Sequence, residues 1–239
     1  MAGCETGPLL HVHLVRERHY LLGPGSGKKP LWFPDTSLLL AVIDRDEPEP
    51  GKWLERFRLT FDTLPLVLIT MRGIASRAES AHAQASEVKT SSRPTSRWHF
   101  AENSSPEVVA RFITLAATPL EFGKTTLVCV DFADYLSALD GGGLIRVVRA
   151  SGQGCEAAVA ASADAVEKLR VMGASLEQAS GAAIIVEISP RNTSAISLFD
   201  TIGNLIKISI HDKAAVLVSV PFNHDLSDDA FNLYLAVRE

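Results

Sequence analysis

The stretch LVCVDFADYLSALDGGG, Leu127 to Gly143, sets two carboxylates three residues apart directly after a run of strand-forming residues. Asp131 and Asp134 would be a poor choice if this segment only had to pack against a core, because carboxylates are costly to bury. The two acids therefore indicate either a functional surface or the start of a helix, where aspartate is favoured as a cap.

The composition is that of a soluble globular protein, with 46% hydrophobic and 21% charged residues in a chain of 239. This length suits one large domain or two small ones. The net charge of -5 and the lack of a basic stripe argue against nucleic acid as a main partner.

No targeting or membrane segment is predicted. The longest apolar runs, such as 38–43 and 64–70, are far shorter than a membrane span. Residues 1–4 lack the basic flank and apolar stretch of a signal peptide, so we expect a cytoplasmic protein.

Metal binding is not predicted either. Cys4, Cys129 and Cys155 are odd in number and widely spaced, which disfavours a disulfide framework or a zinc knuckle. His11 and His13 would share one face of a strand, but no acidic or Cys/His partner is evident nearby. A partly exposed strand is the favoured interpretation.

The first third of the chain predicts a parallel sheet with a crossover helix. Strands are expected at 9–15, 37–43 and 65–70, with a helix at 53–64. The composition then shifts to Ser, Ala, Arg and Thr over 74–105, which predicts a partly helical, partly mobile excursion.

The last part of the chain predicts a mixed α/β subdomain. Ser105, Pro106 and Glu107 give a capped start to a helix that runs to about residue 117. The elements expected after it are strands at 144–149, 181–188, 214–222 and 231–237, and helices at 154–172 and 193–206.

Val130 to Asp134 resembles a loop of FtsZ, the bacterial tubulin homologue, which reads asparagine-X-aspartate-phenylalanine-alanine-aspartate. Three further segments are similar to successive parts of that family: GGGLIRVVRASGQG to a strand and turn, SGAAIIVEIS to a strand, and KAAVLVSVPFNHDLSDDAFNLYLAV to a closing hairpin. The resemblance covers Glu107 to Glu239 in order.

This resemblance implies an α/β fold in which a truncated tubulin/FtsZ-like GTPase-type parallel sheet is joined by a helix to an FtsZ-like C-terminal α/β domain. The expected limits are 1–105 for the truncated nucleotide-binding-type domain, 106–126 for the connecting helix region and 127–239 for the C-terminal domain.

The nucleotide site of the family is only partly matched. LLGPGSGKKP, 21–30, is similar to its short glycine loop at the terminal phosphate, which makes Gly23, Gly25 and Ser26 the candidate nucleotide contacts. A plain turn explains the same residues equally well. With that loop aligned, the family's opening glycine-rich unit would lie before Met1.

The family's phosphate signature GGGTGSG should follow the strand at 37–43, but Asp44 to Pro50 stands there instead. Its four carboxylates would repel a phosphate by about 1 kcal/mol per close pair even in high dielectric, and its prolines remove amide donors. We therefore expect no cofactor of the chain's own, and GTP only where a partner subunit holds it.

The resemblance also implies a role for the two acids. In the family, one subunit's acidic loop inserts over the nucleotide of its neighbour and positions the attacking water. Asp131 and Asp134 are thus the candidate catalytic residues. Phe132 and Tyr135 are expected at the interface, with Phe132 as an anchor beneath the loop. Cys129 replaces the family's asparagine, which weakens the case for catalysis more than the case for docking.

The expected function is therefore a filament cap, or a stimulator of GTP hydrolysis in trans, for an FtsZ-like or tubulin-like partner, possibly the chain itself. Two alternatives stay open from the sequence. The chain could bind and hydrolyse GTP as a divergent oligomer, or serve as a scaffold in which the acids only cap a helix.

Overall fold

The computed structural model describes residues 10–15, 38–43, 66–72, 96–117, 126–128, 130 and 132–239. The chain divides into two compact units, Met1–His99 and Phe100–Glu239, here called unit 1 and unit 2. The expected domain limits at residues 105 and 126 stay predictions.

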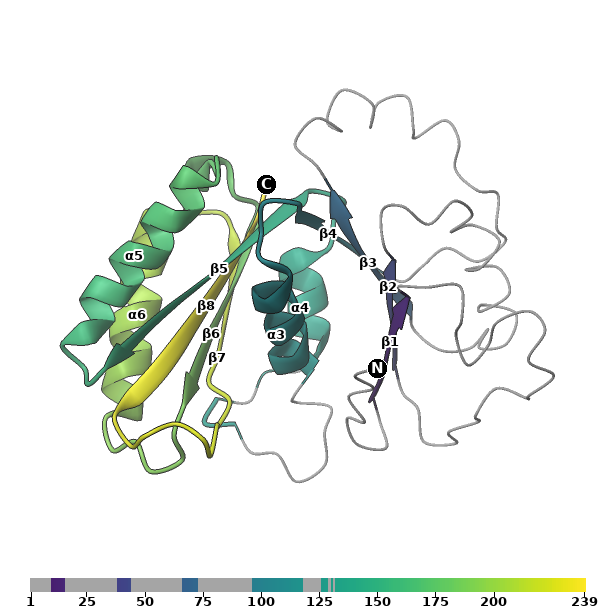
Figure 1. Ribbon diagram of the computed structural model, residues 1–239. Helices are drawn as coiled ribbons and strands as arrows, with labels where there is room; N and C mark the ends of the chain where they lie inside the picture. The colour runs from purple at the N-terminus through teal and green to yellow at the C-terminus, as the bar shows by residue number, and fades with distance from the viewer. Residues whose placement is uncertain are drawn as a thin grey trace, which may run out of the picture. The chain divides into compact units, whose positions relative to one another are not determined.

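Unit 1 contains a parallel sheet, as the sequence predicted. Its strands are β1 (Leu10–Val15), β2 (Leu38–Ile43) and β3 (Leu66–Arg72) (Figure 1). Leu10 is aligned with Leu38 in one parallel pair, and Leu39 with Leu66 in the next. The expected crossover helix at 53–64, the acidic loop at 44–50 and the glycine loop at 21–30 lie outside the described residues.

Strand β4 (Ser96–Ala101) corrects one expectation, because it lies inside the segment predicted to be a partly helical, partly mobile excursion. Trp98 and Phe100 are fully buried. Two aromatic side chains at positions i and i+2 share one face of a strand, and this local alternation outweighs the polar composition around it. The residues at 73–95 lie outside the described part of the chain.

Unit 2 follows the predicted order of elements closely. They are α3 (Pro106–Ala117), α4 (Phe132–Leu139), β5 (Leu144–Gln153), α5 (Ala157–Val171), a short 3₁₀ helix (Leu176–Gln178), β6 (Gly181–Ile188), α6 (Ala195–Ser209), β7 (Ala215–Ser219) and β8 (Ala230–Arg238). The start of α3 is capped as expected, since the Val108 amide donates to the Ser105 hydroxyl oxygen at 3.4 Å.

The strands of unit 2 lie in the order β5-β8-β6-β7. Strand β8 is antiparallel to both β5 and β6, whereas β6 and β7 are parallel. The prediction that the last two strands form a closing hairpin is therefore wrong. The helix α6 carries the chain back so that β7 can pair in parallel with β6, and β8 then inserts between β5 and β6.

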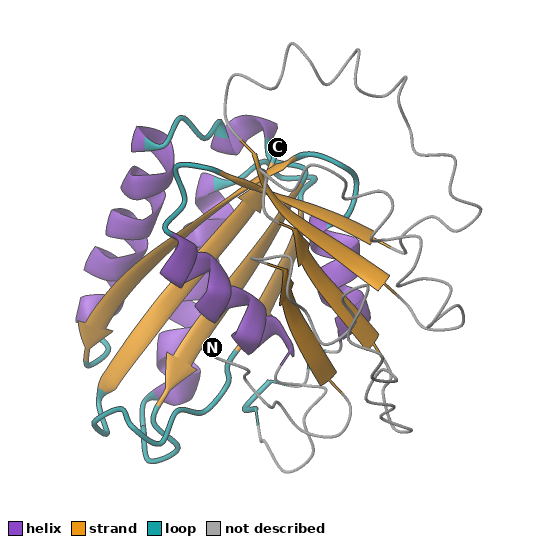
Figure 2. Cartoon of the chain, turned by 45° about the vertical axis from the view of Figure 1, so that its right-hand side comes forward, coloured by secondary structure: helices purple, strands orange, loops and turns teal. Residues whose placement is uncertain are grey.

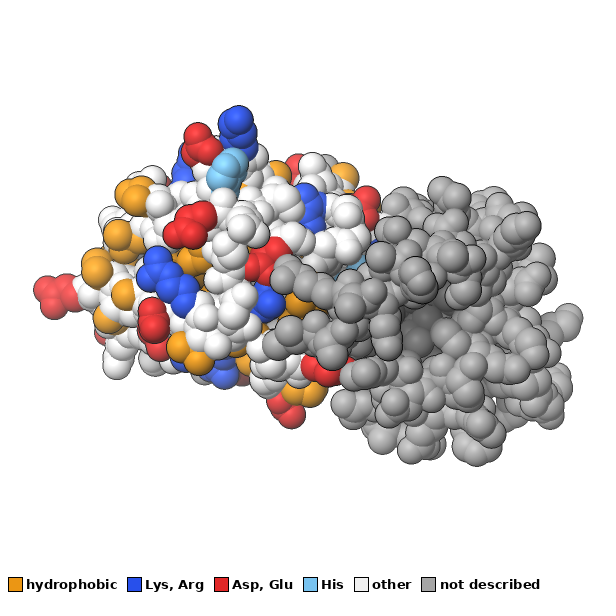
Figure 3. All heavy atoms as spheres, turned by 90° about the horizontal axis from the view of Figure 1, so that it is seen from above, with side chains coloured by type: hydrophobic (Ala, Val, Ile, Leu, Met, Phe, Trp, Pro, Cys, Tyr) orange, Lys and Arg blue, Asp and Glu red, His pale blue; other side chains and the backbone are white. Residues whose placement is uncertain are grey.

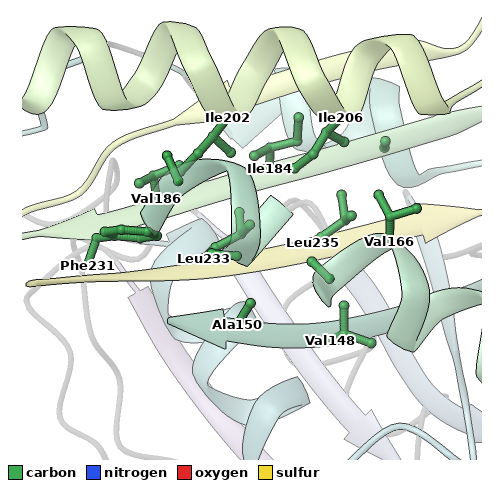
Figure 4. Packing of buried hydrophobic residues seen from close by; sticks show 14 of the residues in the cluster. Val148, Ala150, Val166, Ile184, Val186, Ile202, Ile206, Phe231, Leu233 and Leu235 are labelled. Carbon is green, nitrogen blue, oxygen red and sulfur yellow. The ribbon is translucent and has the colours of Figure 1, made fainter. Parts of the chain in front are cut away.

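Helices cover both faces of this sheet (Figures 1 and 2). Helices α5 and α6 cover one face over the main hydrophobic core, which Figure 4 shows in close view. That core takes alternate residues of each strand, because successive strand residues point to opposite faces. Its fully buried strand members include Ile184, Val186, Leu233 and Leu235. Helices α3 and α4 contact the other face.

Candidate functional site

The acidic segment leads into α4, which begins at Phe132. Asp134 is exposed in the first turn of this helix. A carboxylate at that place interacts favourably with the partial positive charge of a helix N-terminus. Asp131, directly before the helix, and the side chain of Phe132 lie outside the described residues. The structure therefore places one of the two predicted catalytic acids at a surface.

Tyr135 lies in the core of unit 2 and not at its surface, because its side chain is fully buried. Burial raises the pKa of Tyr135 to about 12, the nearby Ser219 hydroxyl opposes that rise, and the charge of Asp134 adds to it. The ring is thus an anchor between α4 and the end of β7, which corrects its predicted place at an interface. Tyr135 and Leu139 lie on one face of α4, four residues apart, as is usual for a helix packed on a sheet.

This buried phenol predicts a loss of stability at alkaline pH. The unfolded chain loses the Tyr135 proton near pH 10, whereas the folded chain keeps it to about pH 12, so stability falls as the pH rises through that window. A rise of this size in the pKa corresponds to roughly 2–3 kcal/mol of stability. The variant Tyr135→Phe should flatten this fall when urea denaturation is followed across the same pH window. An equally steep fall in the variant would contradict the assignment.

The position of α4 is fixed at both of its ends. At its C-terminal end, the carbonyl group of Ala138 lies against Gly181, where a Cβ atom would stand 1.8 Å from the Ala138 oxygen. Before its N-terminal end, the Leu127 amide donates to the Val220 carbonyl at 2.9 Å. The helix therefore starts beside the end of β7 and finishes beside the start of β6, which holds Asp134 at one end of the sheet.

A buried polar cluster, the Glu187 network, lies on the same face of the sheet as α3. Glu187 on β6 is 1% exposed and forms an ion pair with Arg111 of α3. Asn232 of β8 donates to the second Glu187 oxygen at 2.8 Å. Arg149 of β5 donates to the Asn232 side-chain oxygen at 2.7 Å. Three strands and one helix are thus joined through the Glu187 carboxylate and the Asn232 side chain.

The network also changes the acidity of its members. Burial alone would lower the pKa of Arg111, but the charge and hydrogen bond of Glu187, with a smaller contribution from Tyr234, leave that pKa above its usual value. Burial and the Glu187 charge raise the pKa of Tyr234, while Arg149 and Arg111 oppose the rise. Arg149 also lies 6.0 Å from the centre of the Tyr234 ring. Arg111 therefore stays charged, and the cluster can fasten α3 to the sheet.

Sequence reasoning missed the Glu187 network. The strand GAAIIVEI is recognised by its apolar run. That run contains a single carboxylate, and a buried carboxylate requires a paired cation, so the sequence already points to a buried ion pair. Asn232 and Tyr234, two residues apart in β8, repeat the same signal on a neighbouring strand. A search for polar residues in phase on apolar strands would have found this cluster.

The predicted nucleotide contacts Gly23, Gly25 and Ser26 lie outside the described residues. In the part of the chain that the structure describes, no group of three or more His, Cys, Asp and Glu residues could hold a metal ion. No helix among those residues is long and apolar enough to cross a membrane. On the face of unit 2 visible in Figure 3, acidic and basic side chains are intermixed and form no block of one sign.

Comparisons with known proteins bear on the fold. No family model matches the sequence, and no curated protein matches it. Among solved structures, an FtsZ mutant from M. jannaschii matches with a TM-score of 0.60 at 12% identity, covering 86% of this chain and 66% of that chain. CetZ2 from Haloferax volcanii, in a GTPγS-bound protofilament, matches with a TM-score of 0.53 at 13% identity, covering 85% and 65%.

TubZ of Bacillus thuringiensis serovar israelensis, in GDP-form protofilaments, matches with a TM-score of 0.51 at 10% identity, covering 85% of this chain and 61% of that chain. The chain thus spans less than two thirds of the length of each of these three structures. At such identities the likeness shows the fold alone, and the fold is of the FtsZ/tubulin kind. The predicted fold class is confirmed.

Proposed function

We propose that this chain regulates a polymerising FtsZ-like or tubulin-like partner by docking the acidic segment Asp131–Asp134 over the nucleotide that the partner holds. The observation that carries the proposal is the exposed Asp134 in the first turn of α4, on a helix fixed at both ends in an FtsZ/tubulin-like fold. Docking there would cap the filament or stimulate GTP hydrolysis in trans. This role would place the chain in the cytoplasm.

The sequence after β2 supports a role without a nucleotide pocket of the chain's own. Asp44 to Pro50 brings four carboxylates and two prolines to the place where the family has its glycine-rich phosphate loop. Carboxylates repel a phosphate, and prolines offer it no amide donor. The acidic segment would then act on a nucleotide bound by another subunit.

The partner to test is the full-length, filament-forming FtsZ-like GTPase from the same cytoplasm. Filaments formed by this partner with GTP are sedimented with and without an equal concentration of the chain. Capping predicts less polymer and shorter filaments, and stimulated hydrolysis predicts faster GTP turnover followed by disassembly. Unchanged polymer mass, filament length and turnover would refute the proposal.

The acid pair itself is tested by replacing Asp131 and Asp134 with asparagine. Asparagine caps a helix about as well as aspartate, so the double variant should lose only the interaction of the Asp134 charge with the helix N-terminus, about 0.3–1 kcal/mol. It lacks both charges, so its effect on the partner's polymer mass and GTP turnover should be lost. Asp200→Asn, a change at an exposed acid on α6, is the matched control and should act as the wild type.

The asparagine pair also separates docking by the two acids from a purely structural role of these acids in α4. If the acids only stabilise the N-terminus of α4, alanine at both positions should cost about 1 kcal/mol in urea denaturation. The asparagine pair would then affect the partner as the wild type does. That result would favour the scaffold interpretation and contradict the docking interpretation.

A further inference from the structure

The turn between α4 and β5 contains the one aspartate–glycine pair of the sequence, Asp140–Gly141, and two further glycines follow it. Asp140 comes directly after the last residue of α4, and its amide still donates to the Leu136 carbonyl at 2.8 Å. Asp140, Gly141 and Gly142 are exposed. An aspartate side chain is short enough to reach backbone amides next to it in the chain, so this pair can react with itself.

The Gly141 amide is open to such a reaction. It donates no hydrogen bond to any residue that the structure describes. Gly141 and Gly142 have positive φ angles of 129° and 76°, a conformation that favours glycine, and glycine has no Cβ atom to shield its amide. Nothing lies within 4 Å of the place where a Cβ atom of Gly142 would stand, so the turn has room to rearrange.

The asparagine–serine pair at Asn103 and Ser104 shows the opposite situation. The Ser104 amide donates to the Ala101 carbonyl at 2.9 Å, and the Asn103 side-chain amide donates to the Met172 carbonyl at 3.1 Å. Attack by the Ser104 nitrogen would break both hydrogen bonds. The fold therefore protects this pair, whereas the amide in the turn after α4 has no such protection.

We propose that Asp140 converts spontaneously to isoaspartate through a cyclic succinimide. The Gly141 nitrogen bonds to the carboxyl carbon of the protonated Asp140 side chain, and the carboxyl hydroxyl group leaves as water with the amide proton. Water then adds to one of the two carbonyl groups of the ring. Opening at the original peptide bond leaves the main chain running through the Asp140 side chain, and opening at the new bond restores aspartate.

The turn that contains this pair lies directly against the end of β8. A Cβ atom at Gly143 would stand 1.9 Å from the Glu239 carbonyl oxygen, and one at Gly141 would stand 2.9 Å from Arg238 Nη1. The Glu239 amide also donates to the Leu144 carbonyl at 3.1 Å. Isoaspartate adds one carbon atom to the main chain of this turn, which has no space to take it up on that side. The modified chain is therefore less stable.

The test ages the full chain at neutral pH and physiological temperature, folded and in urea, with samples taken over several weeks. Peptides are released at mildly acidic pH and analysed by mass spectrometry with electron-transfer fragmentation, which locates isoaspartate. The folded chain should accumulate isoaspartate at Asp140, with a succinimide peptide lighter by one water, and no product at Asn103. In urea, both sites should react. Product at Asp140 only in urea, or product at Asn103 in the folded chain, would overturn the proposal.

Asp140→Glu is the matched variant, because it keeps the exposed charge but would have to close a larger ring, which forms far more slowly. The aged wild type should lose stability in urea denaturation in step with its isoaspartate content, whereas the aged Asp140→Glu variant should keep its initial curve. Isoaspartate without a loss of stability, or an equal loss in the aged Asp140→Glu variant, would overturn the proposal.

Discussion

Replacing Gly181 with alanine should destabilise unit 2 by about 3 kcal/mol, the upper end of the range for overpacked sites. An alanine Cβ would stand 1.8 Å from the carbonyl oxygen of Ala138 and 2.9 Å from its carbonyl carbon. Both are backbone atoms of α4, so no side-chain rotation can relieve the contact. Either α4 or the start of β6 must move, and with it the anchor of Tyr135 beside the end of β7.

Gly203 provides the matched control for this change. It lies inside α6, and the nearest atom to an added Cβ would be a Val218 methyl at 4.0 Å. Alanine there should stabilise the chain by about 1 kcal/mol, because glycine is a poor residue in a helix interior. Urea denaturation followed by circular dichroism measures both variants. Equal effects of the two substitutions would contradict the close contact between Gly181 and α4.

Replacing Arg146 with methionine should cost roughly 3–5 kcal/mol, the usual effect of breaking a buried ion pair. The Arg146 side chain is 3% exposed and its partner Glu239 is 6% exposed. Arg146 also donates to the Met172 carbonyl at 3.1 Å, and Glu239 accepts from the Ser175 amide. Methionine keeps much of the length of the side chain but leaves the Glu239 charge buried without its cation.

A double variant and a surface pair separate this electrostatic effect from lost packing. Adding Glu239→Gln to Arg146→Met removes the uncompensated charge and keeps an oxygen for the Ser175 amide, so the double variant should be more stable than the single one. Arg170→Met, in an exposed pair with Glu167, should cost less than about 0.5 kcal/mol. If the Arg146 and Arg170 variants lost the same stability, the buried pair would have no special role.

Most elements of unit 2 could be predicted because their signals are local. The apolar run at Gly181–Ile188 and the alanine-rich stretch of α5 need no distant partner to be recognised. Strand β4 was missed because the polar composition of its surroundings masks the alternation of Trp98 and Phe100. The predicted hairpin is wrong for a different reason, since pairing with β6 is a property of the whole sheet and not of the loop between β7 and β8.

The site was predictable only in part. The acidic start of α4 could be read from the sequence, and Asp134 is exposed as a docking residue must be. The burial of Tyr135 follows from its helical spacing with Leu139, a pattern that the neighbouring acidic motif obscures. The Glu187 network joins residues 76 positions apart, as in the ion pair with Arg111. The polar residues inside β6 and β8 mark members of the network in the sequence, but sequence spacing does not show which residues pair.

Docking in trans is tested most sharply by GTP turnover, measured for the chain alone, for its filament-forming partner alone and for their mixture. We predict no turnover by the chain alone and a change in the partner's turnover that grows with the concentration of the chain. The asparagine pair at Asp131 and Asp134 should leave the partner's rate as it is. Turnover by the isolated chain, or a mixture that behaves as the partner alone, would contradict the proposed role.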